Sequence, residues 1–226
     1  VKIGEAAAKA AAPGTEIITV NPSYGPASIE GYYDEVFAIP GLIEEIRKHK
    51  KADAFIIACF DDTGLDAARC ATEVPVIGIG EAGFHFASLV SGKFGVVTTL
   101  ARSIPAIEHN LVKYGLRARC ARVRASDVAV LDLEVPGSDA RMKISNEISK
   151  LVSEDGAEAI VLGCAGMADL TQQLGKEHGL PVLDGVSCAV KLAEGLVSLG
   201  IRTSRTGGYA APQSKTYAGE FAKYSP

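Results

Sequence analysis

The chain has 226 residues, of which 47% are hydrophobic and 22% are charged. These proportions exclude a disordered or fibrous protein and allow one large domain or two small lobes. The formal net charge is −4 at pH 7, so we expect no binding to nucleic acid or to an anionic membrane. Apolar runs such as residues 54–59 are strand-sized, and none approaches the roughly 20 residues that a membrane-spanning helix needs.

Strands and helices are predicted to alternate along the chain. The predicted strands are residues 16–20, 54–59, 76–79, 94–99, 119–123, 159–163 and 182–183. The predicted helices are residues 3–12, 41–49, 64–71, 80–91, 103–114, 140–154, 168–175 and 187–199. Short apolar strands between amphipathic helices predict an α/β fold with mainly parallel sheets flanked by helices. The turn-rich tail from Thr203 is expected to wrap the surface.

An internal repeat divides the chain. Residues 52–60 (Ala-Asp-Ala-Phe-Ile-Ile-Ala-Cys-Phe) align with residues 157–165 (Ala-Glu-Ala-Ile-Val-Leu-Gly-Cys-Ala), at an offset of 105 residues. The offset is 106 where residues 75–78 match residues 181–184. A duplicated half explains this pattern better than chance, although two short α/β segments can converge.

The repeat predicts two pseudo-symmetric lobes with the active site between them. The first lobe would span residues 1–93, completed by residues 187–226, and the second residues 94–186. The second half begins with a predicted strand, and its counterpart in the first half would precede residue 1. We therefore expect a strand and a ligand-facing loop to precede this sequence.

The five cysteines are odd in number and widely spaced, and the chain has only four histidines. This pattern predicts free thiols in a cytoplasmic protein, without a disulfide framework or a structural zinc site. No GxGxxG fingerprint follows a predicted strand, and no Walker motif or GxSxG elbow is present. We expect no metal and no cofactor.

Cys59 and Cys164 end equivalent predicted strands, one in each half. Ligands of open parallel sheets collect at this edge, so we expect the two thiols to face each other across a cleft. A helix start follows each cysteine, and its free N–H groups should lower the pKa of the thiol. For Cys70, Cys120 and Cys188 we expect only the packing role of a small buried side chain.

Two opposed thiols suit the stereoinversion of a carbon acid. A thiolate can remove a proton from one face while a thiol donates a proton to the other face. The intermediate is an enolate, which amides at a helix end can stabilise. This chemistry needs no metal, nucleotide or pyridoxal phosphate.

The residues around these cysteines resemble the cofactor-independent Asp/Glu/hydantoin racemase superfamily. The similarity is closer to hydantoin racemases and their allantoin racemase relatives, and it extends to about residue 220. Three stretches carry it: residues 21–31 (Asn-Pro-Ser-Tyr-Gly-Pro-Ala-Ser-Ile-Glu-Gly), residues 59–69 (Cys-Phe-Asp-Asp-Thr-Gly-Leu-Asp-Ala-Ala-Arg) and residues 163–167 (Gly-Cys-Ala-Gly-Met). The resemblance implies that Cys59 and Cys164 exchange protons with a 5-monosubstituted hydantoin. It also implies a homo-oligomer.

The residue after each cysteine favours a neutral substrate. Amino acid racemases resemble one another in the motifs around their two cysteines, Cys-Asn-Thr and Gly-Cys-Thr, in which a polar residue follows each cysteine. Here Phe60 and Ala165 follow the cysteines. We therefore rank a hydantoin above aspartate or glutamate. Allantoin, a hydantoin with a ureido arm, stays open as the substrate. A non-catalytic binding protein is the alternative from another class, because two-lobed α/β folds can close on a small solute.

Substrate contacts are predicted at the loop formed by residues 25–31 and at the strand ends. The predicted residues are Ser28, Ile29, Phe60, Thr98, Thr99, Gly163, Ala165 and Gly166. An ordinary Gly/Pro connection is the alternative for the loop, and a helix cap is the alternative for the threonines. Asp61 and Asp62 would raise the pKa of a neighbouring thiol, but we expect at least one of them to cap a helix.

Overall fold

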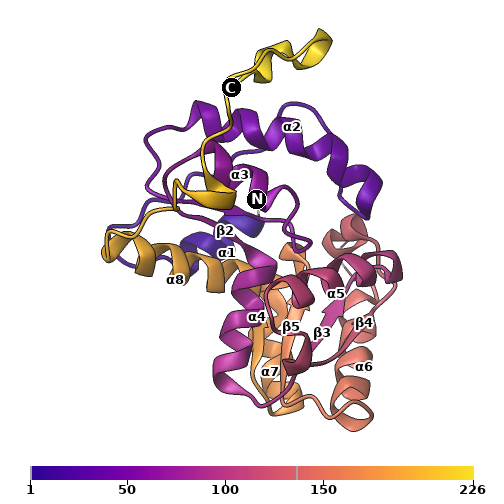
Figure 1. Ribbon diagram of the computed structural model, residues 1–226. Coiled ribbons are helices and arrows are strands. Elements are labelled where there is room, and N and C mark those ends of the chain that lie inside the picture. Colours follow the sequence, from indigo (N-terminus) through magenta and orange to yellow (C-terminus); the bar gives the residue numbers. More distant parts are fainter. Residues whose placement is uncertain (1, 136) are drawn as a thin grey trace.

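Two parallel sheets form the centre of the computed structural model, which describes residues 2–135 and 137–226. The smaller sheet pairs β1 (Phe55–Ile57) with β2 (Val76–Gly78). The larger sheet has the order β4-β3-β5-β6. Its strands are β3 (Phe94–Thr98), β4 (Cys120–Ala125), β5 (Ala159–Gly163) and β6 (Val182–Asp184). The predicted α/β class, with parallel sheets flanked by helices, is confirmed (Figure 1).

Eight α-helices of the described chain surround these sheets. They are α1 (Lys2–Ala10), α2 (Tyr32–Lys48), α3 (Leu65–Ala71), α4 (Ile79–Val90), α5 (Ile104–Lys113), α6 (Ala140–Ser153), α7 (Thr171–His178) and α8 (Gly185–Ser198). Helices α4 and α8 pack against each other, and each contacts strands of both sheets (Figure 1). This helix pair therefore joins the two halves. Helix α8 also contacts α1, while the lobe boundaries at residues 93 and 187 stay a prediction.

The two halves repeat in strand register as well as in sequence. Residues 55–57 of β1 lie beside residues 76–78 of β2. Residues 160–162 of β5 lie beside residues 182–184 of β6. The residue numbers of the first pair, increased by the offsets of the sequence repeat, give those of the second pair. The β1–β2 pair is therefore the structural counterpart of the β5–β6 pair, and Cys59 and Cys164 leave equivalent strands.

Residues 16–20 form no strand, so that prediction is wrong for the described chain. A strand requires a neighbour for its backbone N–H and C=O groups, and no strand pairs with this segment within residues 2–135 and 137–226. Helix α2 also differs, because it begins at Tyr32 and contains Pro40. The predicted helix began only at residue 41, just after this proline.

One hydrophobic core crosses the junction between the halves. The ring of Phe84 on α4 packs edge-on against Phe60 at 5.4 Å and stacks with Phe94 at 5.9 Å between ring centroids. The starts of α4 and α8 approach closely, since a Cβ atom on Gly185 would lie 2.1 Å from the carbonyl oxygen of Ile79. Only glycine fits this approach, so the position of the two helix starts is narrowly defined.

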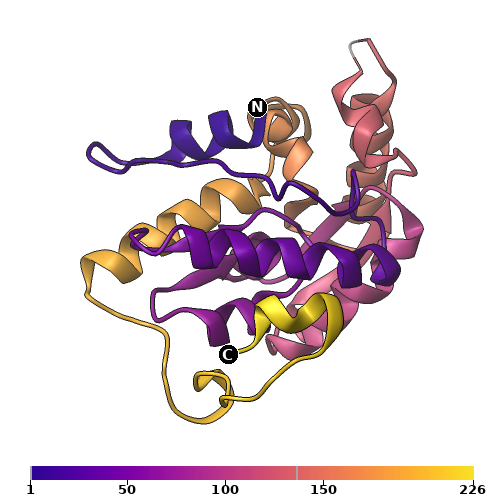
Figure 2. The same ribbon diagram turned by 90° about the horizontal axis from the view of Figure 1, so that it is seen from above.

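The C-terminal segment runs over the surface of the smaller sheet's helices, as predicted (Figure 2). The Arg205 guanidinium donates hydrogen bonds to carbonyl oxygens at the end of α3, those of Arg69, Cys70 and Thr72. No helix in the described ranges is long and apolar enough to cross a membrane.

Candidate active site

Cys59 lies in the turn between β1 and α3. The N–H of Asp62 donates to the Cys59 carbonyl oxygen at 3.0 Å, and the N–H of Leu65 donates to the Asp62 carbonyl oxygen at 3.1 Å. The Cys59 Sγ atom lies 3.2 Å from the Oγ1 atom of the buried Thr63. Two successive turns therefore hold the thiol next to the start of α3. We name residues 59–65 the Cys59 turn.

Cys164 follows the last residue of β5 and precedes a short 3₁₀ helix, Ala165–Leu170. The N–H of Met167 donates to the Cys164 carbonyl oxygen at 3.1 Å. A Cβ atom on Gly166 would lie 3.8 Å from the Cys164 sulfur. The backbone after this cysteine therefore passes close to the thiol without a side chain intervening.

Burial makes both thiols weak acids in this structure. It raises the pKa of Cys59 to about 12 and the pKa of Cys164 to about 11. Hydrogen bonds from the backbone at Asp61 and Thr63 lower the pKa of Cys59, and one at Gly166 lowers that of Cys164. The expected lowering by backbone groups is present but smaller than the desolvation of the buried thiolate. The predicted low thiol pKa is therefore wrong for this structure.

The carboxylate of Asp61 acts on both cysteines. Its charge raises the pKa of Cys59 and also that of Cys164. Since charge interactions weaken with distance, Asp61 lies within electrostatic range of both thiols. Burial, followed by the charges of Glu35 and Asp62, raises the pKa of Asp61 itself to about 7.

Asp62 caps a helix, as expected for one of the two aspartates, but not the helix that it precedes. Its Oδ1 atom accepts from the N–H of Gly80 at 2.9 Å, and its Oδ2 atom accepts from the N–H of Glu81 at 2.8 Å. The hydroxyl of Tyr114 also donates to Oδ2 at 2.8 Å. Asp62 is buried and adopts a left-handed backbone conformation with φ of 50°. It therefore connects the Cys59 turn to α4.

The loop that precedes α2 reaches the second half of the chain. Glu30 accepts a hydrogen bond from the N–H of Val130 at 3.3 Å, and its charge raises the pKa of Cys164. Ser28 and Ile29, just before it, are half-buried. This position brings the predicted loop residues toward the Cys164 side of the site.

Thr98 and Gly163 meet at the carboxyl ends of β3 and β5. The Thr98 hydroxyl donates to the Gly163 carbonyl oxygen at 3.2 Å, and both Thr98 and Thr99 are buried. A Cβ atom on Gly163 would lie 2.9 Å from the Val97 carbonyl oxygen, so the strands leave no room for a side chain there. The alternative role as a helix cap finds no support, because no side chain caps α5 in the described chain.

Phe60 and Ala165 direct their side chains into the core, where they are 4% and 8% exposed. The Phe60 ring packs against Phe84, so a substrate contact from Phe60 must come from its backbone. Sequence reasoning missed the parts played by Tyr114, Glu30 and Glu35. These residues lie far along the chain from either cysteine, and no local pattern in the sequence relates them.

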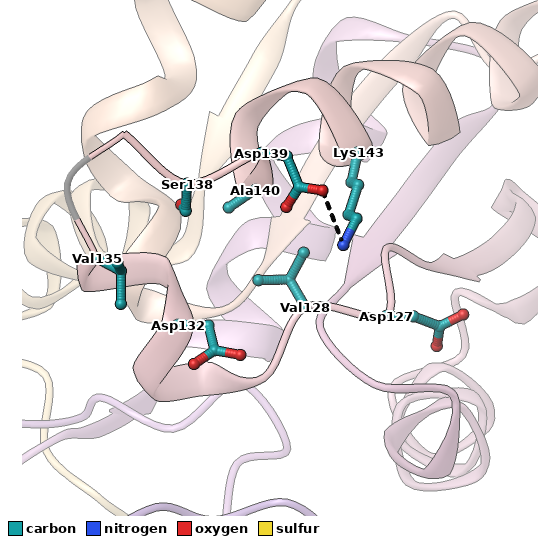
Figure 3. Close-up of a pocket in the computed structure, with 8 residues that line it drawn as sticks. All are labelled: Asp127, Val128, Asp132, Val135, Ser138, Asp139, Ala140 and Lys143. Carbon is teal, nitrogen blue, oxygen red and sulfur yellow. Dashed lines mark ion pairs between the residues drawn. The ribbon is translucent and has the colours of Figure 1, made fainter.

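Two surface pockets lie outside this constellation. One, of about 190 Å³, lies beside the start of α6 and includes the ion pair of Asp139 with Lys143 at 3.1 Å (Figure 3). The other, of about 540 Å³, lies between α1 and α7 and includes Lys9 and Asp169. Neither includes Cys59 or Cys164 among its described lining residues. The part of the chain that the structure describes brings together no group of three His, Cys, Asp or Glu side chains able to hold a metal.

The model of the Asp/Glu/hydantoin racemase family matches residues 2–193. The chain belongs to this family. It is 45% identical over 224 residues to a hydantoin racemase of Pseudomonas sp. (strain NS671), covering 98% of this chain and 90% of that protein. It is 48% identical over 207 residues to a hydantoin racemase of Rhizobium meliloti, covering 91% and 86% of the two chains.

Solved structures of racemases share the fold. Allantoin racemase from Klebsiella pneumoniae is 47% identical to this chain and has a TM-score of 0.95. The match covers 100% of this chain and 93% of that chain. Glutamate racemase from Bacillus anthracis is 22% identical with a TM-score of 0.59, over 79% and 69% of the two chains. The second likeness concerns the fold alone, whereas the hydantoin racemase relatives support racemase activity for this chain.

Proposed function

We propose that this protein racemises 5-monosubstituted hydantoins at C5, without a cofactor, by two opposed cysteines. The observation that carries the proposal is the equivalent position of the two thiols, each just after a strand of the repeat. Cys59 and Cys164 leave equivalent strands of a repeat, and both respond to the charge of Asp61. A carbon acid bound between the two sulfurs would present one face to each.

In the proposed reaction one cysteine acts as thiolate and the other as thiol. The thiolate removes the C5 proton, and the electron pair passes into the adjacent carbonyl group to form an enolate. The opposite thiol then donates its proton to the other face of C5. The two cysteines have exchanged protonation states, so the reverse reaction uses the same groups in exchanged roles.

The environment of the thiols fits an acid–base role with a neutral substrate. Backbone N–H groups beside each sulfur oppose the effect of burial and can stabilise negative charge on the thiolate or the enolate. The charges of Glu30 and Asp61 act on Cys164, and that of Asp61 also acts on Cys59; in their ionised forms these groups would repel the carboxylate of an amino acid. A hydantoin has no carboxylate and offers two N–H donors. This charge pattern favours a hydantoin over aspartate or glutamate.

Allantoin is the second candidate substrate. The 47% identity to an allantoin racemase over the whole chain favours it, and allantoin is itself a hydantoin. The proposed proton transfers at C5 are the same for both, so the two candidates differ only in the group attached to C5.

The test is to add the purified protein to one enantiomer of 5-benzylhydantoin, of allantoin and of aspartate, and to follow optical rotation. We expect rotation to fall to zero for at least one hydantoin faster than in buffer alone, and to stay constant for aspartate. Faster loss for aspartate would contradict the assignment of the substrate class. Binding of a hydantoin without any loss of rotation would favour a binding protein.

A further inference from the structure

The helices that follow β2 and β6 are equivalent in the repeat, but they are capped differently. Asp184 caps its own helix, α8, by accepting from the N–H of Ser187 at 2.7 Å. The equivalent residue before α4 is Gly78, which has no side chain to do this. Asp62 supplies the missing carboxylate from the Cys59 turn. The residue equivalent to Asp62 in the second half is the buried Met167.

The space around Asp62 is built for its carboxylate. A Cβ atom on Gly78 would lie 2.1 Å from Asp62 Oδ1, and a Cβ atom on Gly80 would lie 2.9 Å from Asp62 Oδ2. The same Cβ atom on Gly80 would lie 2.4 Å from the carbonyl oxygen of Phe60. The Cys59 turn therefore packs against the backbone of Gly78 and Gly80. The buried carboxylate of Asp62 fills the space that side chains at these two positions would need.

Two hydrogen bonds connect the turn to the end of α5. The side-chain amide of Asn110 donates to the Asp61 carbonyl oxygen at 2.8 Å, and the hydroxyl of Tyr114, the residue that follows α5, donates to Asp62. The turn is therefore held between the start of α4 and the last turns of α5. Thr63, whose hydroxyl contacts the Cys59 sulfur, is the next residue after Asp62.

We infer that Asp62 is a positioning residue for the Cys59 thiol, with no counterpart at Cys164. This inference rests on the proposed function, because positioning matters for a thiol that transfers a proton. Asp62 does not itself touch the substrate in this account. Its carboxylate fixes the Cys59 turn relative to α4, whereas apolar packing at Met167 holds the equivalent turn at Cys164.

The test compares Asp62→Asn with the matched control Asp184→Asn. Asparagine tolerates the left-handed backbone, but its single carbonyl oxygen cannot reproduce both backbone bonds of the carboxylate. We expect Asp62→Asn to lower kcat by roughly 10- to 100-fold with a KM close to that of the unaltered protein, because displacement of a reacting group chiefly affects the chemical step. Asp184→Asn keeps an oxygen that can accept from the N–H of Ser187, so it removes only the charge at the start of the other helix and should retain kcat within about twofold.

A second readout needs no turnover. The rate of iodoacetamide alkylation is measured separately for Cys59 and Cys164 by mass spectrometry of the folded protein. Asp62→Asn should increase the rate at Cys59, because a released turn exposes more of the half-buried thiol, and leave the rate at Cys164 unchanged. If this variant does not fold, Tyr114→Phe can replace it, because it removes only one bond to Asp62. The alkylation rate at Cys59 should again increase relative to that at Cys164, but by a smaller factor.

Three results would overturn the inference. They are unchanged kcat and alkylation in folded Asp62→Asn, equal changes at the two cysteines, and an equal loss of kcat in Asp184→Asn. For Tyr114→Phe, an unchanged ratio of the two alkylation rates has the same meaning. Absence of turnover by the unaltered protein would instead count against the proposed function, while the alkylation contrast would still decide the positioning role.

Discussion

The hydroxyl oxygen of Thr63 lies 3.2 Å from the sulfur of Cys59, and this contact lowers the pKa of the thiol. Thr63 is 3% exposed, so no water can replace its hydroxyl without rearrangement. Thr63→Val keeps the shape of the side chain and removes this stabilisation of the thiolate. We expect kcat to fall roughly fivefold, the equivalent of ~1 kcal/mol for one hydrogen bond. The pH profile of alkylation should move to higher pH at Cys59 and stay in place at Cys164. A shift at Cys164 with none at Cys59 would contradict the contact.

Replacement of either cysteine of the proposed pair should abolish racemisation. Cys59→Ser and Cys164→Ser each replace a thiol by a much weaker acid, and we expect losses of at least ~100-fold, as for removal of a general acid or base. Cys70→Ser is the control, because the Cys70 thiol donates to the Gly208 carbonyl oxygen in the C-terminal segment. Normal turnover by either of the first two variants, measured by loss of optical rotation, would exclude the two-thiol reaction.

Asp61→Asn should lower the pKa of both thiols, since the charge of Asp61 raises both. The measurement is the pH dependence of alkylation at each cysteine, and both profiles should move to lower pH. A shift at only one cysteine would show that Asp61 is not their common neighbour.

The same substitution should change stability in a defined pH range. Folding raises the pKa of Asp61 from its usual 3.8 to about 7, so the folded protein binds this proton more tightly than the unfolded chain. Its contribution to stability is therefore present at low pH and is lost as the pH rises through this range. Asp61→Asn should raise Tm at pH 8, by ~3 °C for each 1 kcal/mol, and have little effect below pH 4. A lower Tm at pH 8 would contradict the buried environment of this carboxyl group.

Two glycines of α8 should respond in opposite ways to alanine. A Cβ atom on Gly185 would lie 2.1 Å from the Ile79 carbonyl oxygen, whereas one on Gly195 would meet nothing within 4 Å. Gly185→Ala forces α4 and α8 apart, and we expect a loss of about 1–3 kcal/mol, as for overpacking of a core. Gly195→Ala should gain about 0.5–1 kcal/mol from helix propensity. Urea unfolding measures both, and equal effects would show that the helix starts are not in close contact.

The repeat made much of the fold predictable from the sequence. Residues 94–98 and 159–163 form strands where their apolar runs indicated, because both are buried on both faces of a parallel sheet. The alignment of Cys59 with Cys164 also located the candidate thiols. Residues 16–20 failed as a strand, because pairing depends on a neighbouring strand and not on the segment alone.

The surroundings of the thiols were less predictable. The bond from Tyr114 to Asp62 joins residues 52 positions apart in the sequence, and only the packing of α5 beside α4 brings them together. The sequence also suggested that backbone groups would lower the thiol pKa. The extent of burial, which exceeds that effect at both cysteines, depends on the whole fold.

Solvent deuterium labelling at early times tests the central claim, that two groups act on opposite faces of C5. One enantiomer of a turned-over hydantoin is incubated in D2O, and the two enantiomers are separated before much product has formed. Two-thiol transfer predicts deuterium at C5 of the product enantiomer, while the remaining starting enantiomer keeps its proton. Equal labelling of both enantiomers, or product that retains the original proton, would show that a single group moves the proton and would contradict this account.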